Sequence, residues 1–288
     1  GHFCFKLAQG CHAPRPVARV TFQAPMFDFD ELPDRSDGED DAPAPAPAPK
    51  VQPAPLGRKV RILALHGGGA NTNIMKYQTA NLRQQLGDAA EWDFLNGTRP
   101  WSYDPGEPMQ LLADGMPFYG WYGVSDDGDP RRAYLDRLFD PSVTFTYNDV
   151  DAVIDRVWKR IQEQGPYDVI CAFSQGCVVA HLLAGFLRAR GEALPWRLSV
   201  LFNGVCVRDA RYRSLFDTPL SVPAVFILGR RDEFYEYGKK QVEMYEDHTV
   251  LEHDEGHKFP NSRPRSKEVY DAVIKKIQWH SGLQSAPS

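Results

Sequence analysis

One stretch, residues 169–180, constrains the fold of this chain more than any other, because it passes from an apolar strand directly into an apolar helix. Ser174 stands at the junction, and the helix begins at Gln175. A turn this sharp is sterically tight and needs small residues two positions before and after the serine, which Ala172 and Gly176 supply. The pattern predicts a nucleophile elbow with Ser174 raised out of the sheet. A buried serine at an ordinary strand–helix junction gives the same pentapeptide, so the rest of the chain must decide between the two.

The backbone around this turn is suited to binding a negative charge. The amino end of the helix places free N–H groups beside the serine oxygen, and the N–H of Gln175 points to where an oxyanion would form. A glycine-rich loop, residues 66–71, follows the apolar strand 60–65, and its three consecutive glycines let the backbone approach a ligand closely. The loop lacks the spacing and the lysine of a phosphate-binding P-loop. We therefore expect the N–H groups of Gly68 and Gln175 to form an oxyanion hole.

Strand and helix signals alternate from residue 59 to residue 280. Most of the strands are near-continuous apolar runs, which is typical of a parallel sheet covered on both faces. We therefore predict an α/β fold, with a mostly parallel sheet and helices on both of its faces. The expected strands are 60–65, 92–95, 167–173, 197–202, 224–228 and 248–253, and the expected helices are a first one capped by Thr72 or Asn73 and running to about Leu86, then 150–164, 175–190, 235–245 and 269–279.

Two more side chains able to take part in catalysis follow predicted strands. Asp232 comes just after strand 224–228, and His257 comes just after strand 248–253. The carboxyl ends of parallel strands meet at one edge of the sheet, where such sheets place their sites. With Ser174, these residues stand in the order nucleophile, acid, base that is expected on an α/β-hydrolase sheet. We expect His257 to take the Ser174 proton and return it to the leaving group, while Asp232 holds the imidazole tautomer.

Other residues compete for these roles. Glu233 and Asp254 are alternatives to Asp232, which is preferred because it comes earliest after its strand. The spacing of His253 and His257 would suit a metal site on a helix, but the strand and the glycine around them interrupt such a helix. We therefore predict that these histidines bind no metal ion.

Residues 97–147 show little clear periodicity and many aromatic side chains. Loops this long inside a compact domain are usually functional or disordered, and so many rings argue against disorder. We interpret the segment as an aromatic-rich lid insertion over the site, lining an apolar pocket; the alternative is that its rings only fill the core beneath it. The candidate pocket residues are Trp101, Phe118, Tyr119 and Trp121 from this segment, together with Phe259 from the loop after His257.

The first 57 residues differ in composition from the rest of the chain. Residues 27–41 are strongly acidic, and an alternating Ala-Pro run occupies residues 42–49. Such runs favour extended polyproline II and act as semi-rigid spacers. We expect residues 1–57 to be an extension or linker, disordered in part, with the catalytic domain at 58–282 and a tail at 283–288. The linker could join a neighbouring domain, or the segment could be a tail without consequence.

Charge and hydropathy exclude several classes of partner. A net charge of −5 gives no basic footprint for nucleic acid or an anionic membrane, and no apolar run is long enough to span a bilayer. The five cysteines show no metal-type spacing, and Cys171, Cys177 and Cys206 lie in apolar runs, which favours a reducing compartment such as the cytoplasm. The chain begins with Gly1 rather than Met, which is expected of a fragment or a processed form and allows a longer parent chain, so its first residues give no information about targeting.

As a set, these motifs resemble the FSH-type serine hydrolases of the α/β-hydrolase superfamily, over about residues 58–280. The resemblance implies esterase or thioesterase activity on acyl chains, no cofactor, and the triad of Ser174, Asp232 and His257. Ala172 stands where the family usually has glycine, and the third glycine of the loop, Gly69, is a second departure. The matching motifs are Leu65-His66-Gly67 with its glycine-rich loop, Phe118-Tyr119-Gly120-Trp121-Tyr122, Phe173-Ser174-Gln175-Gly176, Gly229-Arg230-Arg231-Asp232 and Gly256-His257-Lys258-Phe259-Pro260.

The sequence therefore predicts a serine hydrolase that cleaves a carboxylic ester or thioester through an acyl-Ser174 intermediate. Its expected partner is a small-molecule acyl ester or thioester. An acyltransferase with the same triad is one alternative, and a non-catalytic binding protein on the same fold is another, since a fold does not determine a function.

Overall fold

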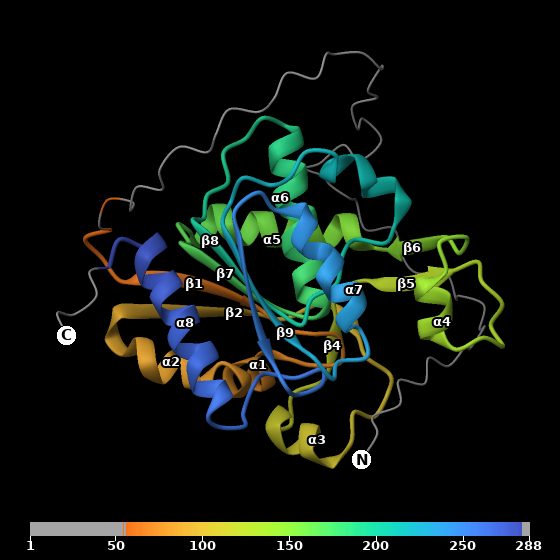
Figure 1. Ribbon diagram of the computed structural model, residues 1–288, viewed down its shortest axis with the longest axis horizontal. Helices are drawn as coiled ribbons and strands as arrows, with labels where there is room; N and C mark the ends of the chain where they lie inside the picture. The colour runs from red at the N-terminus through yellow and green to blue at the C-terminus, as the bar shows by residue number, and fades with distance from the viewer. Residues whose placement is uncertain (1–53, 55, 284–288) are drawn as a thin grey trace, which may run out of the picture.

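A computed structural model describes residue 54 and residues 56–283, which fold around a six-stranded sheet (Figure 1). The strand order is β10-β9-β8-β7-β1-β2, and every neighbouring pair is parallel. This architecture confirms the predicted α/β fold. The strands are β1 (Val60–Leu65), β2 (Ala90–Leu95), β7 (Val169–Phe173), β8 (Leu198–Phe202), β9 (Ala224–Gly229) and β10 (His248–His253).

Helices cover both faces of this sheet. One face carries α1 (Thr72–Gln78), α2 (Ala80–Leu86) and α8 (Arg265–His280), and the other carries α5 (Val150–Gln164) and α6 (Gln175–Ala189) (Figure 1). Side chains of β1 alternate between the two apolar clusters, as the pleat of a strand requires. The three central strands β7, β8 and β9 have every residue buried, which explains their continuous apolar sequences.

The first helix differs from its prediction at both ends. Its cap is Asn71, one residue before the two predicted caps, and the Asn71 Oδ1 accepts the N–H of Asn73 at 3.0 Å. The helix ends at Gln78, and a second helix begins at Ala80. Thr79 separates the two, with its hydroxyl donating to the carbonyl of Met75 at 2.7 Å, because threonine can bond to a carbonyl of the preceding turn.

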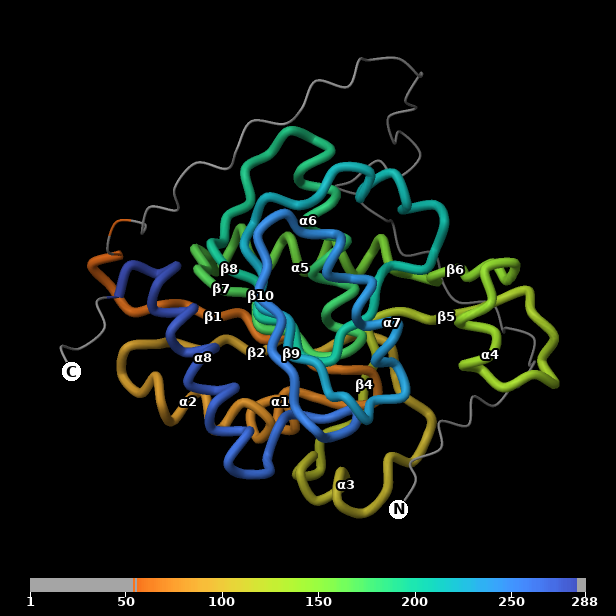
Figure 2. Tube along the Cα trace, viewed as in Figure 1, coloured from red at the N-terminus to blue at the C-terminus, as the bar shows by residue number. Residues whose placement is uncertain are grey.

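Residues 97–147 form short elements rather than one loop. The hairpin of β5 (Gly123–Asp126) and β6 (Phe145–Asn148) lies with α4 (Tyr134–Phe139) at one side of the domain (Figure 2). Strand β3 (Arg99–Pro100) pairs antiparallel with β4 (Tyr119–Gly120), and α3 (Glu107–Ala113) lies between them in the chain. The aromatic rings divide accordingly: some are in the core, and others are partly exposed. The function of this segment as a lid stays a prediction.

The last quarter of the domain connects β8, β9 and β10 through short helical turns. These are a 3₁₀ helix at Ala210–Phe216, helix α7 (Tyr235–Lys240) and a further 3₁₀ turn at Gln241–Met244, so the helix predicted over 235–245 is shorter than expected. No helix in residues 54 and 56–283 combines the length and the apolar character needed to cross a membrane. The predicted extension lies almost wholly outside the described residues, and so do residues 284–288 of the predicted tail, so the domain boundaries stay predictions.

Candidate active site

Ser174 lies at the turn between β7 and α6 in a strained backbone conformation. Its φ is 51° and its ψ is −117°, a region that residues other than glycine rarely adopt. The turn is tight because Gly176 packs against β1: a Cβ there would lie 2.6 Å from the carbonyl oxygen of Leu65 and 2.7 Å from that of His66. Only glycine fits this position. The sequence requirement for a small residue after the serine therefore has a direct structural cause.

The side chains of Ser174, His257 and Asp232 form a continuous hydrogen-bonded chain. The His257 Nε2 lies 2.8 Å from the Ser174 Oγ, and its Nδ1 lies 2.7 Å from the Asp232 Oδ2. Because the carboxylate can only accept, Nδ1 carries the proton and Nε2 is free to accept the serine hydroxyl. The rings of Phe173 and Phe234 lie 5.1 and 5.3 Å from the imidazole and restrict its orientation.

Asp232, rather than either of its sequence competitors, faces the imidazole. Its carboxylate side chain is 3% exposed, and its second oxygen accepts the N–H of Phe234 at 2.9 Å. Asp254 is instead exposed and pairs with Arg230 at 3.4 Å. Glu233 lies beside the site and is largely exposed to solvent. The protein removes part of the water around its carboxyl, which raises the pKa of that group. A buried carboxylate at hydrogen-bonding distance from Nδ1 is the arrangement that fixes an imidazole tautomer.

The two residues predicted to donate to an oxyanion, Gly68 and Gln175, come from the glycine-rich loop and from the start of α6. Gln175 is the first residue of α6, so its N–H is among the amides that have no partner within the helix. The glycine-rich loop lies against the elbow: a Cβ at Gly67 would be 3.3 Å from the Ser174 Cβ, and a Cβ at Gly68 would be 3.2 Å from the Gln175 Oε1. The glycine-rich loop and Gln175 thus lie together beside Ser174, and the role of the Gly68 and Gln175 N–H groups as an oxyanion hole stays a prediction.

The side chain of Gln175 joins these loops to the aromatic segment, a role that the sequence did not suggest. Its Oε1 accepts the N–H of Trp121 at 2.8 Å, and its Nε2 donates to the carbonyl of Tyr122 at 2.9 Å. The carboxamide also lies close to Gly120, where a Cβ would be 3.2 Å from its oxygen. One side chain therefore holds the residues directly after β4 against the turn that carries Ser174.

His66 is the first residue of the glycine-rich loop, and its fully buried side chain helps to fix the backbone of that loop. Its Nε2 accepts the N–H of Gly97 at 2.9 Å, so its Nδ1 must carry the proton, which it donates to the carbonyl of Gly67 at 2.6 Å. Burial lowers the pKa of this imidazole to about 4, so it is neutral at physiological pH. The Trp121 indole donates to the His66 carbonyl at 2.7 Å. These bonds set the position of Gly67 and Gly68.

Among the predicted pocket residues, Trp101 packs with its ring against the glycines of the glycine-rich loop. Its indole lies against glycine backbone, and a Cβ at Gly69 would be 2.8 Å from the indole nitrogen, while one at Gly120 would be 3.1 Å from the ring. Gly69 also has a φ of 69°, which favours glycine. Gly69, the third glycine of the loop, therefore makes room for Trp101. This glycine is a departure from the family that the chain resembles.

The other predicted pocket residues lie deeper or on the far side of the loop. Tyr119 exchanges backbone hydrogen bonds with Ala70, and Phe118 packs beside Ala70 in a small apolar cluster. Trp121 is 1% exposed, and Phe259 is 6% exposed and stacks on Phe202 with ring centroids 4.1 Å apart. The structure therefore places Trp101 against the glycine-rich loop and places Trp121 and Phe259 in the apolar core. Their role in binding substrate stays a prediction.

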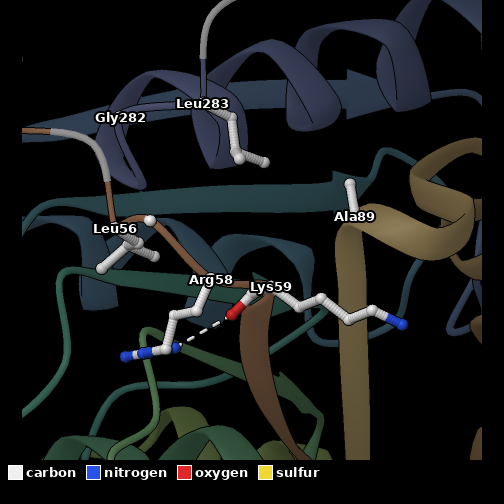
Figure 3. Close-up of a pocket in the computed structure, with 7 residues that line it drawn as sticks. Leu56, Arg58, Lys59, Ala89, Gly282 and Leu283 are labelled. Atoms are coloured by element: carbon white, nitrogen blue, oxygen red, sulfur yellow. Dashed lines mark hydrogen bonds between the residues drawn. The ribbon is translucent and has the colours of Figure 1, made fainter.

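A hollow on the surface lies at the opposite end of the strands (Figure 3). It is lined by residues that include Leu56, Lys59, Ala89 and Leu283. Lys59 precedes the first residue of β1, whereas Ser174 follows the last residue of β7, so the hollow and the hydrogen-bonded chain occupy opposite edges of the sheet. Among residues 54 and 56–283, no group of three or more His, Cys, Asp and Glu side chains is arranged to hold a metal ion.

Comparisons with known proteins show what this chain is similar to. A family model described as Serine hydrolase (FSH1) matches residues 56–269, from before β1 into α8. The chain is 25% identical over 225 residues to Esterase GA18864 of Drosophila pseudoobscura pseudoobscura, which covers 77% of this chain and 73% of that protein. It is 27% identical over 234 residues to Esterase FPY3 of Fusarium mangiferae, with 76% and 96% covered. The crystal structure of esterase PE8 is similar with a TM-score of 0.47 and 16% identity, covering 78% of this chain and 96% of PE8.

Proposed function

The chain belongs to the serine hydrolase (FSH1) family, and we propose that it cleaves a carboxylic ester or thioester with Ser174 as nucleophile, His257 as general base and Asp232 as the orienting acid. The observation that carries the proposal is the hydrogen-bonded chain through His257, with distances of 2.8 Å to the Ser174 Oγ and 2.7 Å to the Asp232 Oδ2. Strain at Ser174 supports it as well, because strained residues cluster at active sites.

The proposed reaction begins when the Ser174 Oγ attacks the carbonyl carbon of the substrate and its proton passes to the His257 Nε2. The carbonyl oxygen becomes an oxyanion, which the N–H groups of Gly68 and Gln175 stabilise. As the carbon–oxygen or carbon–sulfur bond breaks, His257 gives its proton to the leaving alcohol or thiol. Water then attacks the acyl-Ser174 ester with its proton passing to His257, and the returning proton releases the carboxylic acid and free serine. Asp232 holds the Nδ1–H throughout and stabilises the imidazolium.

We also propose that the acyl chain lies against Trp101, which is partly exposed beside Gly68. The relatives named above are esterases, which favours an ester substrate, and sulfur leaving groups follow the same chemistry. Family membership favours hydrolysis over acyl transfer and over a non-catalytic binding role. From the cysteines we propose that the protein works in a reducing compartment such as the cytoplasm. From the Ala-Pro run at 42–49 we propose that a neighbouring domain lies beyond it.

The test is the variant Ser174→Ala, compared with Ser125→Ala as a control at an exposed serine of β5. We expect Ser174→Ala to lose labelling by a fluorophosphonate probe and to lose turnover of p-nitrophenyl esters by a factor on the order of 10⁶. Ser125→Ala should behave as the unmodified protein. A hydrolysis panel that crosses acyl length with oxygen and sulfur leaving groups then assigns the preferred substrate. Labelling that persists in Ser174→Ala would exclude this serine as the nucleophile.

A further inference from the structure

Asn203 directly follows β8 and has two unusual features for a residue outside the hydrogen-bonded chain. Its side chain is buried, with the residue 1% exposed, and its φ is 43°, in the left-handed region that asparagine tolerates better than other non-glycine residues. A buried carboxamide must find partners for both its oxygen and its nitrogen, because an unpaired polar group inside a protein is costly. The partners of Asn203 come from two different loops.

One partner belongs to the loop that carries the acid. The Asn203 Oδ1 accepts the N–H of Gly229 at 2.8 Å, at the end of β9 and three residues before Asp232. The other partners belong to the loop that carries the imidazole. The Asn203 Nδ2 donates to the carbonyl of Lys258 at 2.9 Å and to the carbonyl of Gly256 at 3.4 Å. These two carbonyls flank His257 on either side in the chain.

The orientation of this carboxamide follows from its neighbours. If the carboxamide were flipped, its nitrogen would face the N–H of Gly229, which places a donor against a donor. Its oxygen would then face the carbonyls of Gly256 and Lys258, which places an acceptor against acceptors. The orientation in the structure satisfies all three groups, so it is the stable one. Aspartate in place of Asn203 would keep the acceptor for Gly229 but would have no N–H to offer the two carbonyls.

The two loops are otherwise in direct backbone contact, without a side chain between them. A Cβ at Gly229 would lie 2.5 Å from the carbonyl oxygens of Glu255 and Gly256, so this crossing admits only glycine. The N–H of Arg231 donates to the carbonyl of Glu255 at 3.1 Å. Asn203 lies at this crossing and bonds to both sides of it.

We propose that Asn203 is a positioning residue that sets the distance and orientation between Asp232 and His257, an inference that rests on the proposed function of these two residues. Both side chains project from loops, so the 2.7 Å bond between them depends on how the loops sit relative to each other. Removing the carboxamide frees the carbonyls on either side of His257, and the imidazole loses its fixed position. A misplacement of about 1 Å in a catalytic group costs on the order of 10²-fold in rate.

The first experiment uses Asn203→Gly and Asn203→Asp in the full chain. Glycine adopts a φ of 43° without strain, so it removes the carboxamide alone, whereas aspartate keeps the size of the side chain and the acceptor for Gly229. Ser199→Ala is the matched control: Ser199 is fully buried in the same strand, at its amino end, and its Oγ accepts the Trp196 indole N–H at 3.1 Å. This control weakens β8 without reaching the loops at the other end.

The measurements are kcat and KM for a p-nitrophenyl ester, thermal unfolding, and the downfield proton NMR signal of the His257 Nδ1–H bound to Asp232. We expect both Asn203 variants to lose kcat by about 10²-fold with little change in KM, and to lose or broaden the downfield signal. Ser199→Ala should lower the unfolding temperature and keep both kcat and the signal. A loss of kcat with little change in KM, together with the loss of the downfield signal, distinguishes a positioning role from general destabilisation.

Three outcomes would overturn the inference. They are an unchanged kcat in both Asn203 variants, a loss of kcat with the downfield signal intact, and a loss of activity that only tracks the loss of folded protein. None of these outcomes bears on the nucleophile. The Ser174→Ala variant in the same assay tests the proposed function separately: turnover retained there removes the triad, whereas turnover lost there with unchanged Asn203 variants removes only the positioning role.

Discussion

At each of the two edges of the parallel sheet, a buried carboxylate oxygen lies 2.7 Å from a side-chain nitrogen of its partner. The two partners differ in whether they can give up a proton. At the carboxyl edge, Asp232 faces His257, whose other nitrogen reaches a serine hydroxyl. At the amino edge, Asp168 faces Arg58, and both of its oxygens accept from that guanidinium. Arginine stays protonated at any pH a protein meets, so its pair cannot pass a proton.

A similar closed arrangement lies within β2, away from the carboxyl edge. Asp93 accepts two hydrogen bonds of 2.8 Å from Arg160 and a further one from the Tyr167 hydroxyl. Burial acts to raise the pKa of Asp93, but these hydrogen bonds outweigh it and lower the pKa. The comparison teaches that burial of a carboxylate does not by itself mark a catalytic site. A partner that can change its protonation state, followed by a group that can react, distinguishes the carboxyl edge.

The largest effect on this comparison should come from Asp232→Asn. The substituted amide would donate rather than accept at the Nδ1 side, so His257 would adopt the wrong tautomer and could not take the Ser174 proton. We expect kcat for a p-nitrophenyl ester to fall by about 10⁴-fold, with thermal stability nearly unchanged. A fall of less than about tenfold would assign the acid to another residue, for which Glu233→Gln is the control variant.

The second effect should be on stability alone, from Asp168→Ala at the amino edge. The variant leaves the N–H of Arg61, which donates to Asp168 at 2.8 Å, without its acceptor, and it leaves Arg58 without its partner. Because the Arg58 side chain is 36% exposed, we expect a loss of about 2–3 kcal/mol, at the low end of the range for a broken buried pair. Urea unfolding gives the loss, and kcat of the folded protein should stay unchanged. A drop in kcat at full folding would mean that the two edges are coupled.

A third, smaller effect tests the oxyanion side of the carboxyl edge. In Gln175→Glu, one carboxylate oxygen still accepts the Trp121 N–H, but the other opposes the Tyr122 carbonyl instead of donating to it. The backbone N–H of residue 175 is retained with a less well fixed position, so we expect about a tenfold loss in kcat, below the 10²–10³-fold cost of removing a donor. The affinity for a trifluoromethyl ketone, which mimics the tetrahedral intermediate, should fall in the same proportion as kcat/KM. Unequal losses would contradict a role in stabilising the oxyanion.

The smallest effect is a change in stability at low pH, and it arises in the loop that carries His257. Burial acts to raise the pKa of Glu255, but the hydrogen bonds from Lys258 and from the N–H groups of Asn261 and Ser262 lower it from 4.5 to about 2. A carboxyl whose pKa is depressed in the folded state contributes stability above its unfolded pKa and loses it as the pH falls through the folded one. We therefore expect the unfolding temperature to fall between about pH 4.5 and pH 2, and Glu255→Gln to flatten that fall. The exposed Glu243→Gln is the control, and an equal slope in both variants would contradict the role of Glu255.

The three residues of the hydrogen-bonded chain could be predicted because each follows a predicted strand of a parallel sheet. Asn203 carries the same signal, as a polar residue directly after the buried strand β8, but asparagine has no proton-transfer chemistry to single it out. Gly176 was likewise predictable, because only glycine fits where backbone approaches backbone. The competition between Asp232 and Asp254 was open in the sequence, since both follow strands.

Local sequence therefore determined the parallel sheet, the strained turn at Ser174 and the residues able to move a proton, because alternation, steric size and acid–base chemistry are properties of short segments. Only the tertiary structure decided that the Gln175 carboxamide holds the aromatic segment, that His66 sets the glycine loop, and that Asn203 bonds to the loops of both Asp232 and His257. These are contacts between residues far apart in the chain, and their geometry depends on how whole loops pack at one edge of the sheet. No period or motif within a single segment encodes that packing.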